Sequence, residues 1–469
     1  MRLKVLAIAS ALLTAVLAPI HSSAAVTPPI KSDTHFEGDT QGPYTSIYMD
    51  QFFAKAKVNF IISAGSSLIV ESTTASSQAV IDGTNLSFTL PAALDTAELN
   101  KVYVTYHSAS DNRDYWIYLN PPALHPYGFD GDTSALDSKT MLYTPGTFVI
   151  AQKQNNILFF ERTPDATYAF QKLRAPAKVS KGTATYAYLV KTDSTRKTSE
   201  PGYWIYLDAN FRAIDSTTSF TIGGAKMQPE GHDITVSAAG NPVMMSYFPR
   251  TVKSDWLATP YTPQIFDCVI AEIGKDGKPV HAFSTWDYVN GNKKVWKPIL
   301  DKSETATDTS ANYSATDWCH INSINYDVKS SQYIVSYRSL DRVFLISNDF
   351  KKVNAILTAP GARQHYARMI NPTTVTALGN YTSGTASKLL TWTFAKKKWT
   401  LKTDLLPLHM NYCGNINKLT ATTYFVAGGC GTATPQVFGY VVSTTTSPWS
   451  LIGTVKSAHI PPYRIELTN

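Results

Sequence analysis

Short runs of alternating apolar and polar residues, separated by turn residues, make up most of this chain. In its first quarter such runs cover residues 58–62, 67–71, 86–90, 102–106 and 115–119, with Gly, Asn, Asp and Ser between them. A period of two predicts β-strands, and several short strands at this spacing are typical of a β-sandwich. Asn120-Pro121-Pro122 follows the last run and predicts a linker.

From about residue 130 onward the chain repeats one unit, in which two strands are joined by a turn of Gly, Asp, Asn or Lys. The unit recurs at residues 203–215, 264–284, 342–357, 388–401 and 436–455, and each copy follows another pair of strands. Repeats of four strands at intervals of tens of residues predict a β-propeller. The predicted fold class is therefore all-β, a sandwich followed by a propeller whose number of blades the irregular spacing leaves open.

A hairpin at residues 317–338 carries three polar groups that suit an anion. His320 and Asn322 share one side of its first strand, residues 327–331 form the turn, and Arg338 ends the second strand. Side chains two residues apart in a strand share a face. The imidazole, the amide and the guanidinium are therefore expected to lie near one end of a sheet, which predicts an anion site there.

Three histidines occupy equivalent positions in successive units, because His232, His320 and His365 each open a pair of strands. The corresponding unit near residues 411–414 has no histidine. The innermost strand of each blade lines the central channel of a propeller, so equivalent positions point to one shared space. This pattern favours a functional site on the axis.

Each of these residues also has a structural interpretation. His365 would hydrogen-bond a neighbouring backbone carbonyl, and Asn322 would simply end a strand. Arg338 would form an ion pair with Asp341 or Asp327, which is the usual arrangement for an exposed arginine beside an aspartate. The convergence of three histidines favours the functional interpretation over this one.

The first residues predict a secretory signal peptide. Arg2 and Lys4 precede an apolar run at residues 5–17, and small residues at 23–25 offer a cleavage site. The alternative is a membrane anchor, but the run is short for a bilayer span and Pro19 follows it. We therefore expect residues 1–25 to be removed and the protein to be exported, periplasmic or secreted, without membrane insertion.

The charge of the chain and the spacing of its His and Cys residues argue against nucleic-acid binding and against a metal site. The formal net charge of +7 includes Arg2 and Lys4, and the remaining lysines are scattered apart from Lys396-Lys397-Lys398 at an expected hairpin turn. Without a dense basic face or a recognition motif, the sequence argues against nucleic-acid binding. No His or Cys cluster has metal-ligand spacing, so no metal site is predicted.

Four cysteines in an exported chain predict disulfides before thiol chemistry. Cys413 and Cys430 flank an expected hairpin, so a local bridge between them is the first prediction. Cys268 and Cys319 would then pair or stay free. Cys319 is adjacent to His320, but neighbouring strand residues point to opposite faces, which argues against a catalytic Cys–His pair.

The chain resembles the bacterial arylsulfotransferase family, exported enzymes that do not use a nucleotide sulfate donor. The interval of 18 residues between His320 and Arg338 is the most specific part of the resemblance. The matching segments are His232-Asp233-Ile234 with Gly240-Asn241, residues 317–323 with Ser336-Tyr337-Arg338, and Gln364-His365 with Gly379-Asn380.

The resemblance implies a six-bladed propeller with an active site at its central channel, and an N-terminal sandwich suits the family's domain order. It implies a sulfuryl group that passes from an aryl sulfate donor to a phenolic acceptor by a ping-pong mechanism, without a metal or nucleotide cofactor. It also suggests a homodimer. His365 would be the nucleophile, and the sulfuryl oxygens would be held by His232, His320, Asn322 and Arg338.

The predicted domains are residues 26–125, a sandwich with its linker, and residues 126–469, the propeller. The alternative function is a non-catalytic secreted propeller that binds a glycan, a peptide or a surface component, because propellers host many functions. A binding protein would lose only affinity on replacement of His365 by Ala, whereas the enzyme would lose turnover.

Overall fold

The structure is a computed structural model that describes residues 128–468 except residues 155, 164, 193–200, 253–263, 301–305, 311–312, 382–385, 411–412, 429–436 and 457–461. Before residue 128 it describes only the backbone of eight strands. The predicted signal peptide and the predicted domain boundary after residue 125 lie outside the described residues, so both stay predictions.

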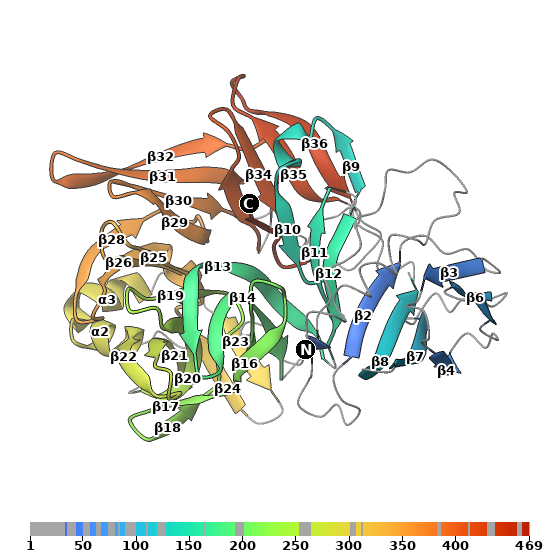
Figure 1. The fold of residues 1–469 in the computed structure, drawn as a ribbon. Coiled ribbons are helices and arrows are strands. Elements are labelled where there is room, and N and C mark those ends of the chain that lie inside the picture. The colour runs from blue at the N-terminus through green and yellow to red at the C-terminus, as the bar shows by residue number, and fades with distance from the viewer. Residues whose placement is uncertain are drawn as a thin grey trace.

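The eight N-terminal strands form two sheets at one side of the molecule (Figure 1). The five-stranded sheet has the order β1 (Asp33–Thr34), β2 (Tyr44–Met49), β8 (Asp111–Leu119), β7 (Asn100–Ser108) and β4 (Ser67–Thr73). The three-stranded sheet has the order β3 (Lys57–Ile61), β6 (Asn85–Thr89) and β5 (Val80–Asp82). All five runs predicted from the sequence are strands, and two sheets fit the predicted sandwich.

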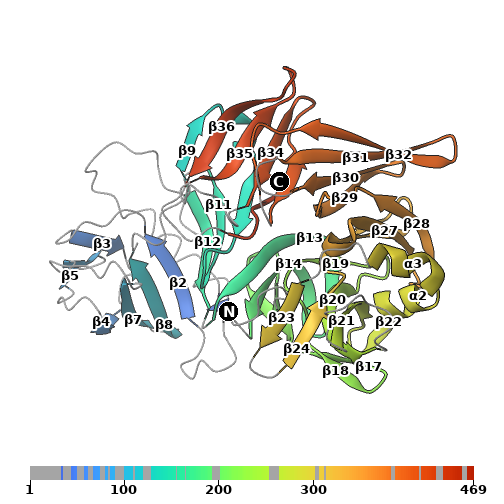
Figure 2. The ribbon, with the colours of Figure 1, turned by 180° about the vertical axis from the view of Figure 1, so that it is seen from behind.

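Six sheets arranged in a ring form a six-bladed β-propeller, as Figure 2 shows from the opposite side. Blade 1 contains β37 (Glu466–Thr468), β10 (Thr140–Tyr143), β11 (Phe148–Lys153) and β12 (Asn156–Arg162), and blade 2 contains β13 (Thr167–Val179), β14 (Gly182–Lys191), β15 (Gly202–Leu207) and β16 (Ala213–Thr217). Blade 3 contains β19 (Ile234–Val236), β20 (Pro242–Thr251), β21 (Gln264–Ile273) and β22 (Pro279–Ser284).

Blade 4 contains β25 (Ile321–Asp327), β26 (Gln332–Tyr337), β27 (Arg342–Ser347) and β28 (Val353–Thr358). Blade 5 contains β29 (His365–Asn371), β30 (Thr374–Gly379), β31 (Lys388–Ala395) and β32 (Lys398–Leu405), and blade 6 contains β33 (Asn415–Lys418), β34 (Thr423–Ala427), β35 (Val437–Ser443) and β36 (Ser450–Lys456). In each blade the first-named strand is the innermost. The five predicted strand–turn–strand units are the outer hairpins of blades 2 to 6.

Strands from both ends of the propeller close the ring. The C-terminal β37 pairs with β10 and completes blade 1, so the last strand of the chain lies in the first blade. At the other end, β9 (Gly128–Gly131) pairs with β36 at the outer edge of blade 6. The C-terminal strand is thus hydrogen-bonded to blade 1, and the first strand of the propeller region is hydrogen-bonded to blade 6.

Hydrophobic clusters fill the spaces between blades. The described residues form six such clusters, one between each pair of neighbouring blades, around residues such as Val149, Val269, Phe344, Leu390, Val426 and Phe438. Because neighbouring blades cover both faces of a sheet, β21 is buried along almost its entire length. Its apolar run therefore lacks strict alternation, as expected for a strand covered on both sides.

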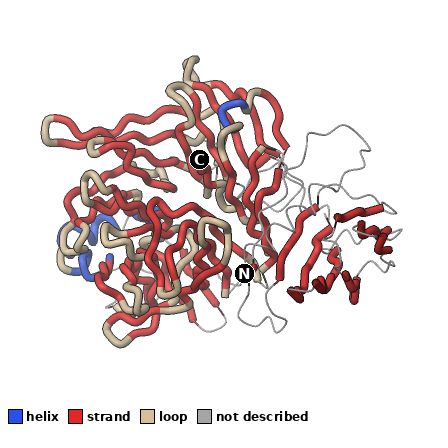
Figure 3. The backbone as a smooth tube through the Cα atoms, viewed as in Figure 1, coloured by secondary structure: helices blue, strands red, loops and turns tan. Residues whose placement is uncertain are grey.

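Two short helices, drawn in blue in Figure 3, were not predicted from the sequence. They are α2 (Thr285–Asn290) and α3 (Lys293–Leu300), and they follow β22. The hydroxyl of Ser284 accepts the backbone N–H of Asp287 at 2.9 Å and caps α2. Further additions are the hairpin β17 (Phe220–Ile222) and β18 (Ala225–Met227), and the pair β23 (Ala306–Ser310) and β24 (Tyr313–Asp317) that extends blade 3.

Candidate active site

The three histidines lie where the innermost strands of three consecutive blades begin. His232 precedes β19, His320 precedes β25, and His365 is the first residue of β29. The ring centroids of His232 and His320 are 5.3 Å apart. The charges of both act on the imidazole of His365. The structure thus brings the three histidines of blades 3, 4 and 5 together at one end of the central channel.

The prediction that His320 lies within a regular strand is wrong. β25 begins at Ile321, and His320 has a φ of 43°, in the left-handed region. The carboxylate of Asp317 accepts the backbone N–H of His320 at 2.9 Å and stabilises this turn. A shift of register between Ile321 and Ser323 follows, so simple alternation does not hold here. Such backbone conformations cost about 1–3 kcal/mol and cluster at functional sites.

Carboxylates anchor two of the imidazoles through Nδ1. Glu230 Oε1 lies against His232 Nδ1, and the other oxygen of Glu230 accepts the backbone N–H of His232 at 2.8 Å. Asp317 Oδ2 lies 2.5 Å from His320 Nδ1. A carboxylate on Nδ1 fixes the hydrogen there, so in both neutral rings Nε2 is the position that exchanges a proton.

A neutral amide anchors His365 instead. Its Nδ1 lies 2.6 Å from Asn380 Oδ1 and 3.0 Å from the carbonyl oxygen of Arg363. The amide of Asn380 cannot be reversed without loss, because its Nδ2 donates to the backbone oxygens of Met410 (2.8 Å) and Cys413 (3.0 Å). Both neighbours of Nδ1 are therefore acceptors, and Nδ1 carries the hydrogen.

This tautomer leaves a lone pair on His365 Nε2. That atom is buried and has no hydrogen-bond partner within the described part of the chain. The hydrogen bond to a backbone carbonyl that the structural interpretation expects is present, because His365 contacts the carbonyl oxygen of Arg363. It involves only Nδ1 and leaves Nε2 without a partner among the described residues. A buried imidazole nitrogen with a lone pair and no partner is suited to attack an electrophile.

The surroundings of His365 favour its neutral form. Burial lowers the pKa of His365 well below its usual value of 6.5. The positive charges of Arg338 and the two other histidines lower this pKa further, against a smaller opposing effect of the hydrogen bond to Asn380. Burial also lowers the pKa of His320, whereas the charge of Asp317 opposes this shift. His365 is therefore neutral near pH 7, as a nucleophile must be.

Arg338 and Asn322 lie in the same region. Arg338 opens a 3-10 turn, Arg338–Leu340, and its backbone N–H donates to the carbonyl oxygen of His320 at 2.8 Å. Asn322 Nδ2 donates to the carbonyl oxygen of Gln364 at 2.8 Å, directly before His365. Arg338 therefore brings a permanent charge close to two of the imidazoles, and Asn322 connects the innermost strands of blades 4 and 5.

Several residues of this region were not singled out in the sequence. Tyr168 and Tyr463 stack with ring centroids 4.4 Å apart, and each lies about 5.1 Å from the ring of His232. The Tyr168 hydroxyl is 3.3 Å from His232 Nε2. The signal was their position, since both lie where the innermost strand of a blade begins. Glu230 and Asp317 had a signal too, because each precedes its histidine by two or three residues.

A buried ionic network lies directly behind the histidines. Asp233 Oδ2 is 2.9 Å from Arg368 Nη2, and Asp233 Oδ1 is 3.0 Å from Arg464 Nη2. The guanidinium of Arg368 lies 3.7 Å above the ring of Tyr366, whose hydroxyl donates to Glu466 at 2.6 Å. These residues come from blades 1, 3 and 5 and from the segment before β37, so the network joins blades that are distant in sequence.

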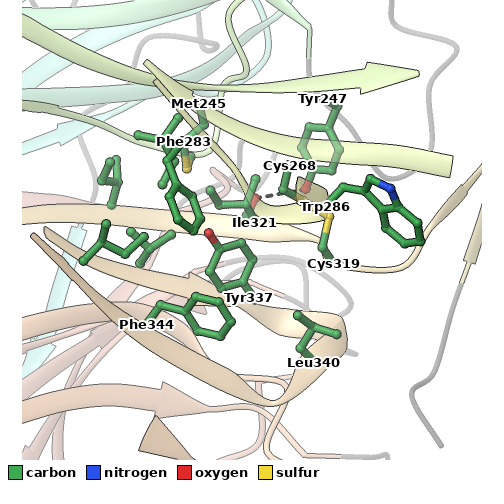
Figure 4. Packing of buried hydrophobic residues seen from close by; sticks show 14 of the residues in the cluster. Met245, Tyr247, Cys268, Phe283, Trp286, Cys319, Ile321, Tyr337, Leu340 and Phe344 are labelled. Atoms are coloured by element: carbon green, nitrogen blue, oxygen red, sulfur yellow. Dashed lines mark hydrogen bonds between the residues drawn. A yellow bond between two sulfur atoms is a disulfide. The ribbon is translucent and has the colours of Figure 1, made fainter. Parts of the chain in front are cut away.

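A disulfide supports the turn that holds His320. Cys319 is bonded to Cys268 of β21, at a sequence separation of 51 and with 6.4 Å between their Cα atoms. Figure 4 shows this bond among apolar side chains, near the hydrogen bond from the Tyr247 hydroxyl to the carbonyl oxygen of Ile321. Cys413 is also disulfide-bonded, as predicted, and its predicted partner Cys430 lies outside the described residues.

We expect the double replacement of Cys268 and Cys319 by Ser to lower the free energy of unfolding by about 2–4 kcal/mol, because the bond closes a long loop. Urea-induced unfolding of the oxidised wild-type protein and the variant measures this difference. A reduced wild-type protein should be no more stable than the variant, because reduction also breaks the disulfide of Cys413. Equal stability of oxidised protein and variant would contradict the expected contribution of this bond.

No three His, Cys, Asp or Glu side chains are grouped so as to hold a metal ion in the part of the chain that the structure describes. Within the same residues, no helix has the length and apolar character needed to cross a bilayer. The disulfide between Cys268 and Cys319 is typical of proteins from oxidising compartments.

One protein-family model matches part of the chain. Residues 230–380 match the model of the arylsulfotransferase (ASST) family. No curated protein sequence matches the chain significantly. Among solved structures, the chain is similar to hydrazine synthase of Kuenenia stuttgartiensis, with 7% identity, a TM-score of 0.35, and coverage of 64% of this chain and 71% of that one.

Another similar structure is the dihydro-heme d1 dehydrogenase NirN, with 8% identity, a TM-score of 0.32, and coverage of 74% of this chain and 79% of that one. Both scores are too low to carry an argument about function. The family match spans all three histidines, Asn322, Arg338 and Asn380.

Proposed function

Because residues 230–380 match the arylsulfotransferase family, we propose that this protein moves a sulfuryl group from an aryl sulfate to a phenol through a covalent intermediate on His365. The observation that carries this mechanism is the buried Nε2 of His365, which has a lone pair and no partner among the described residues. A covalent intermediate divides one displacement into two easier steps, each of which exchanges one partner of the sulfur atom.

In the first step, the lone pair of His365 Nε2 forms a bond to sulfur while the bond from sulfur to the aryl oxygen breaks. The sulfuryl group is planar at the transition state and carries negative charge on three oxygens. Arg338 supplies a permanent positive charge and a rigid set of donors for them. The second amide hydrogen of Asn322, which has no partner among the described residues, would add another donor.

In the second step, the oxygen of a phenol attacks the sulfur and the bond to His365 Nε2 breaks. The hydrogen on His365 Nδ1 stays between the ring and Asn380 in both steps. The nitrogen that attacks sulfur in the first step, Nε2, is therefore also the leaving nitrogen in the second. Tyr168 and Tyr463 offer stacked aromatic surfaces beside the histidines, which suit the aryl ring of either substrate.

Release of phenol from a chromogenic aryl sulfate, with and without a second phenol as acceptor, tests the proposed function. We expect release to depend on the acceptor, because the sulfated enzyme must pass its group on before it can react again. Release that is independent of any acceptor would indicate hydrolysis by a sulfatase. No release from several donors by a folded protein would favour the binding propeller instead.

The charge of Arg338 is expected to set the pH dependence of the reaction. A positive charge beside an imidazole lowers its pKa, so replacement of Arg338 by Gln should raise the pKa of His365. As the pH is lowered, His365 then becomes protonated at a higher pH than in the wild-type protein. The acid limb of the pH profile of kcat/KM should therefore shift to higher pH. Removal of this donor should also lower kcat by roughly 100–1000-fold.

Replacement of Arg338 by Lys is the matched control, because it keeps the charge and removes the planar set of donors. The acid limb of this variant should stay near that of the wild-type protein although its kcat falls. An acid limb that moves equally in both variants, or that stays in place in both, would contradict the assigned role of the charge.

A further inference from the structure

The two histidines beside His365 have different surroundings, and this difference bears on proton transfer. The leaving phenolate needs a proton in the first step, and the acceptor phenol must lose one in the second. His232 and His320 are both anchored by a carboxylate at Nδ1, so both carry their exchangeable position at Nε2. What lies at that second nitrogen decides which imidazole can serve the substrate.

The Nε2 of His232 is occupied. It lies 3.3 Å from the hydroxyl of Tyr168, and its side chain is only 4% exposed. The rings of Tyr168, Tyr463 and His320 pack around the ring of His232, with centroid distances to that ring of 5.1 to 5.3 Å. His232 is therefore held at both nitrogens and packed against three rings, which suits a fixed part of the site.

The Nε2 of His320 is in a different position. It has no hydrogen-bond partner among the described residues, and its side chain is 10% exposed, against 4% for His232. The left-handed turn capped by Asp317 and the disulfide of Cys319 hold its backbone. The charged and titratable groups that act on it most strongly are Asp317, Arg338 and His232.

We propose that His320 is the residue that gives the proton to the leaving phenolate and takes it from the acceptor phenol, and that Asp317 positions it for this role. His232, held by Glu230 and Tyr168, does not transfer the proton. This assignment rests on the proposed sulfuryl transfer.

The step balances in both directions. His320 enters the first step as the imidazolium, with a hydrogen on Nε2 as well as on Nδ1, a form that the charge of Asp317 favours. When the bond from sulfur to the aryl oxygen breaks, the electron pair left on that oxygen takes the hydrogen from His320 Nε2, and His320 becomes neutral. In the second step, the hydrogen of the acceptor hydroxyl passes to His320 Nε2 as the new bond from oxygen to sulfur forms. His320 ends as it began, and no further reactant is needed.

The basicity of the leaving group separates a proton donor from a structural residue. The probes are 4-nitrophenyl sulfate, whose phenolate leaves without help, and phenyl sulfate, whose phenolate is far more basic. Replacement of Asp317 by Asn should lower the rate of sulfuryl transfer from phenyl sulfate by roughly 100-fold or more. The rate of transfer from 4-nitrophenyl sulfate should fall by less than about tenfold. His320→Gln should show the same preference, which covers the case that Asp317→Asn fails to fold.

The matched variant at the other dyad is Glu230→Gln, which should slow both donors by the same factor. Asp349→Asn, in the turn between β27 and β28, controls for the exchange of a carboxylate for an amide and should leave both rates unchanged. Equal slowing of both donors by Asp317→Asn would overturn the proposal, and so would a loss in Glu230→Gln that depends on the leaving group.

A second measurement does not depend on activity. NMR titration of the histidine rings should show a lower pKa for His320 in Asp317→Asn than in the wild-type protein, because the carboxylate favours the charged imidazole. An unchanged titration would contradict the pairing of Asp317 with His320. If the wild-type protein transfers no sulfuryl group at all, the proposed function fails, whereas this titration still tests the pair.

Discussion

Replacement of His365 by Ala should lower kcat for sulfuryl transfer by roughly 10⁴-fold or more, the scale of loss seen when a covalent nucleophile is removed. Of the three imidazoles, only that of His365 presents a fully buried nitrogen with a lone pair and no partner among the described residues, since the side chain of His320 is 10% exposed. Without that nitrogen the donor has no acceptor for its sulfuryl group. Steady-state release of phenol in the presence of an acceptor measures the loss.

His281→Ala is the matched control, because His281 lies on β22, the outermost strand of blade 3. We expect its turnover to stay within about twofold of the wild-type value, as for most substitutions far from a functional site. Circular dichroism of His365→Ala should match that of the wild-type protein. A folded His365→Ala variant that keeps more than a tenth of the wild-type turnover would refute the role of His365 as nucleophile.

Replacement of Asp233 by Asn should lower the free energy of unfolding by about 3–5 kcal/mol, because it leaves buried positive charges without their counter-charge. Asp233 is buried and forms ion pairs with both Arg368 and Arg464. Burial alone would raise the pKa of Asp233, but the two guanidinium groups lower it below its usual value of 3.8. The folded protein therefore stabilises the charged, carboxylate form of Asp233.

The sign of the pH dependence follows from this lowered pKa. A carboxyl group with a lower pKa in the folded state contributes stability above its unfolded pKa and loses it as the pH falls through its folded value. The difference between the wild-type protein and Asp233→Asn should therefore be complete near pH 7 and shrink below pH 3.8.

Asp349→Asn provides the control for this stability measurement, since the interactions of Asp349 are local and exposed: hydrogen bonds from the Ser347 hydroxyl and the Lys351 backbone N–H, and a pair with the Lys351 side chain at 3.7 Å. Its effect should be much smaller than that of Asp233→Asn, because exposed ion pairs contribute little to stability. Urea-induced unfolding at several pH values measures all three proteins. If Asp233→Asn were no less stable than Asp349→Asn, the network behind the histidines would not be a main support of the ring.

Local patterns predicted the strands well. The turn at Lys396-Lys397 joins β31 to β32, and both residues adopt positive φ, as tight hairpin turns require. The irregular spacing left the number of blades open, because β17, β18, β23, β24 and two helices interrupt the repeat. α2 and α3 were missed because their buried residues are few, and tertiary packing stabilises such short helices more than local preference does.

The site was predictable at the positions that repeat. His232, His320 and His365 followed from their equivalent places in successive blades. Asn380 was recognised only as part of a motif, because its role depends on the carbonyl oxygens of Met410 and Cys413, which lie in another blade connection. Contacts of this kind join residues far apart in sequence, and no local pattern encodes them.

The backbone of His320 shows the same limit. Alternation along a strand predicted that His320 and Asn322 share a face, whereas His320 lies in a left-handed turn before β25 and a register shift follows it. The tyrosines were missed because only the complete ring places Tyr463, near the C-terminus, against Tyr168 of blade 2. A homodimer, which the family resemblance suggests, stays a prediction.

Detection of the sulfated enzyme tests the central claim most directly. The wild-type protein is mixed with an aryl sulfate without acceptor, quenched at alkaline pH, and analysed by intact mass and peptide mapping. We predict a gain of one sulfuryl group, located on His365, that disappears when a phenol is added and is absent from His365→Ala. Turnover without any such adduct, or an adduct on His232 or His320 instead, would contradict the account.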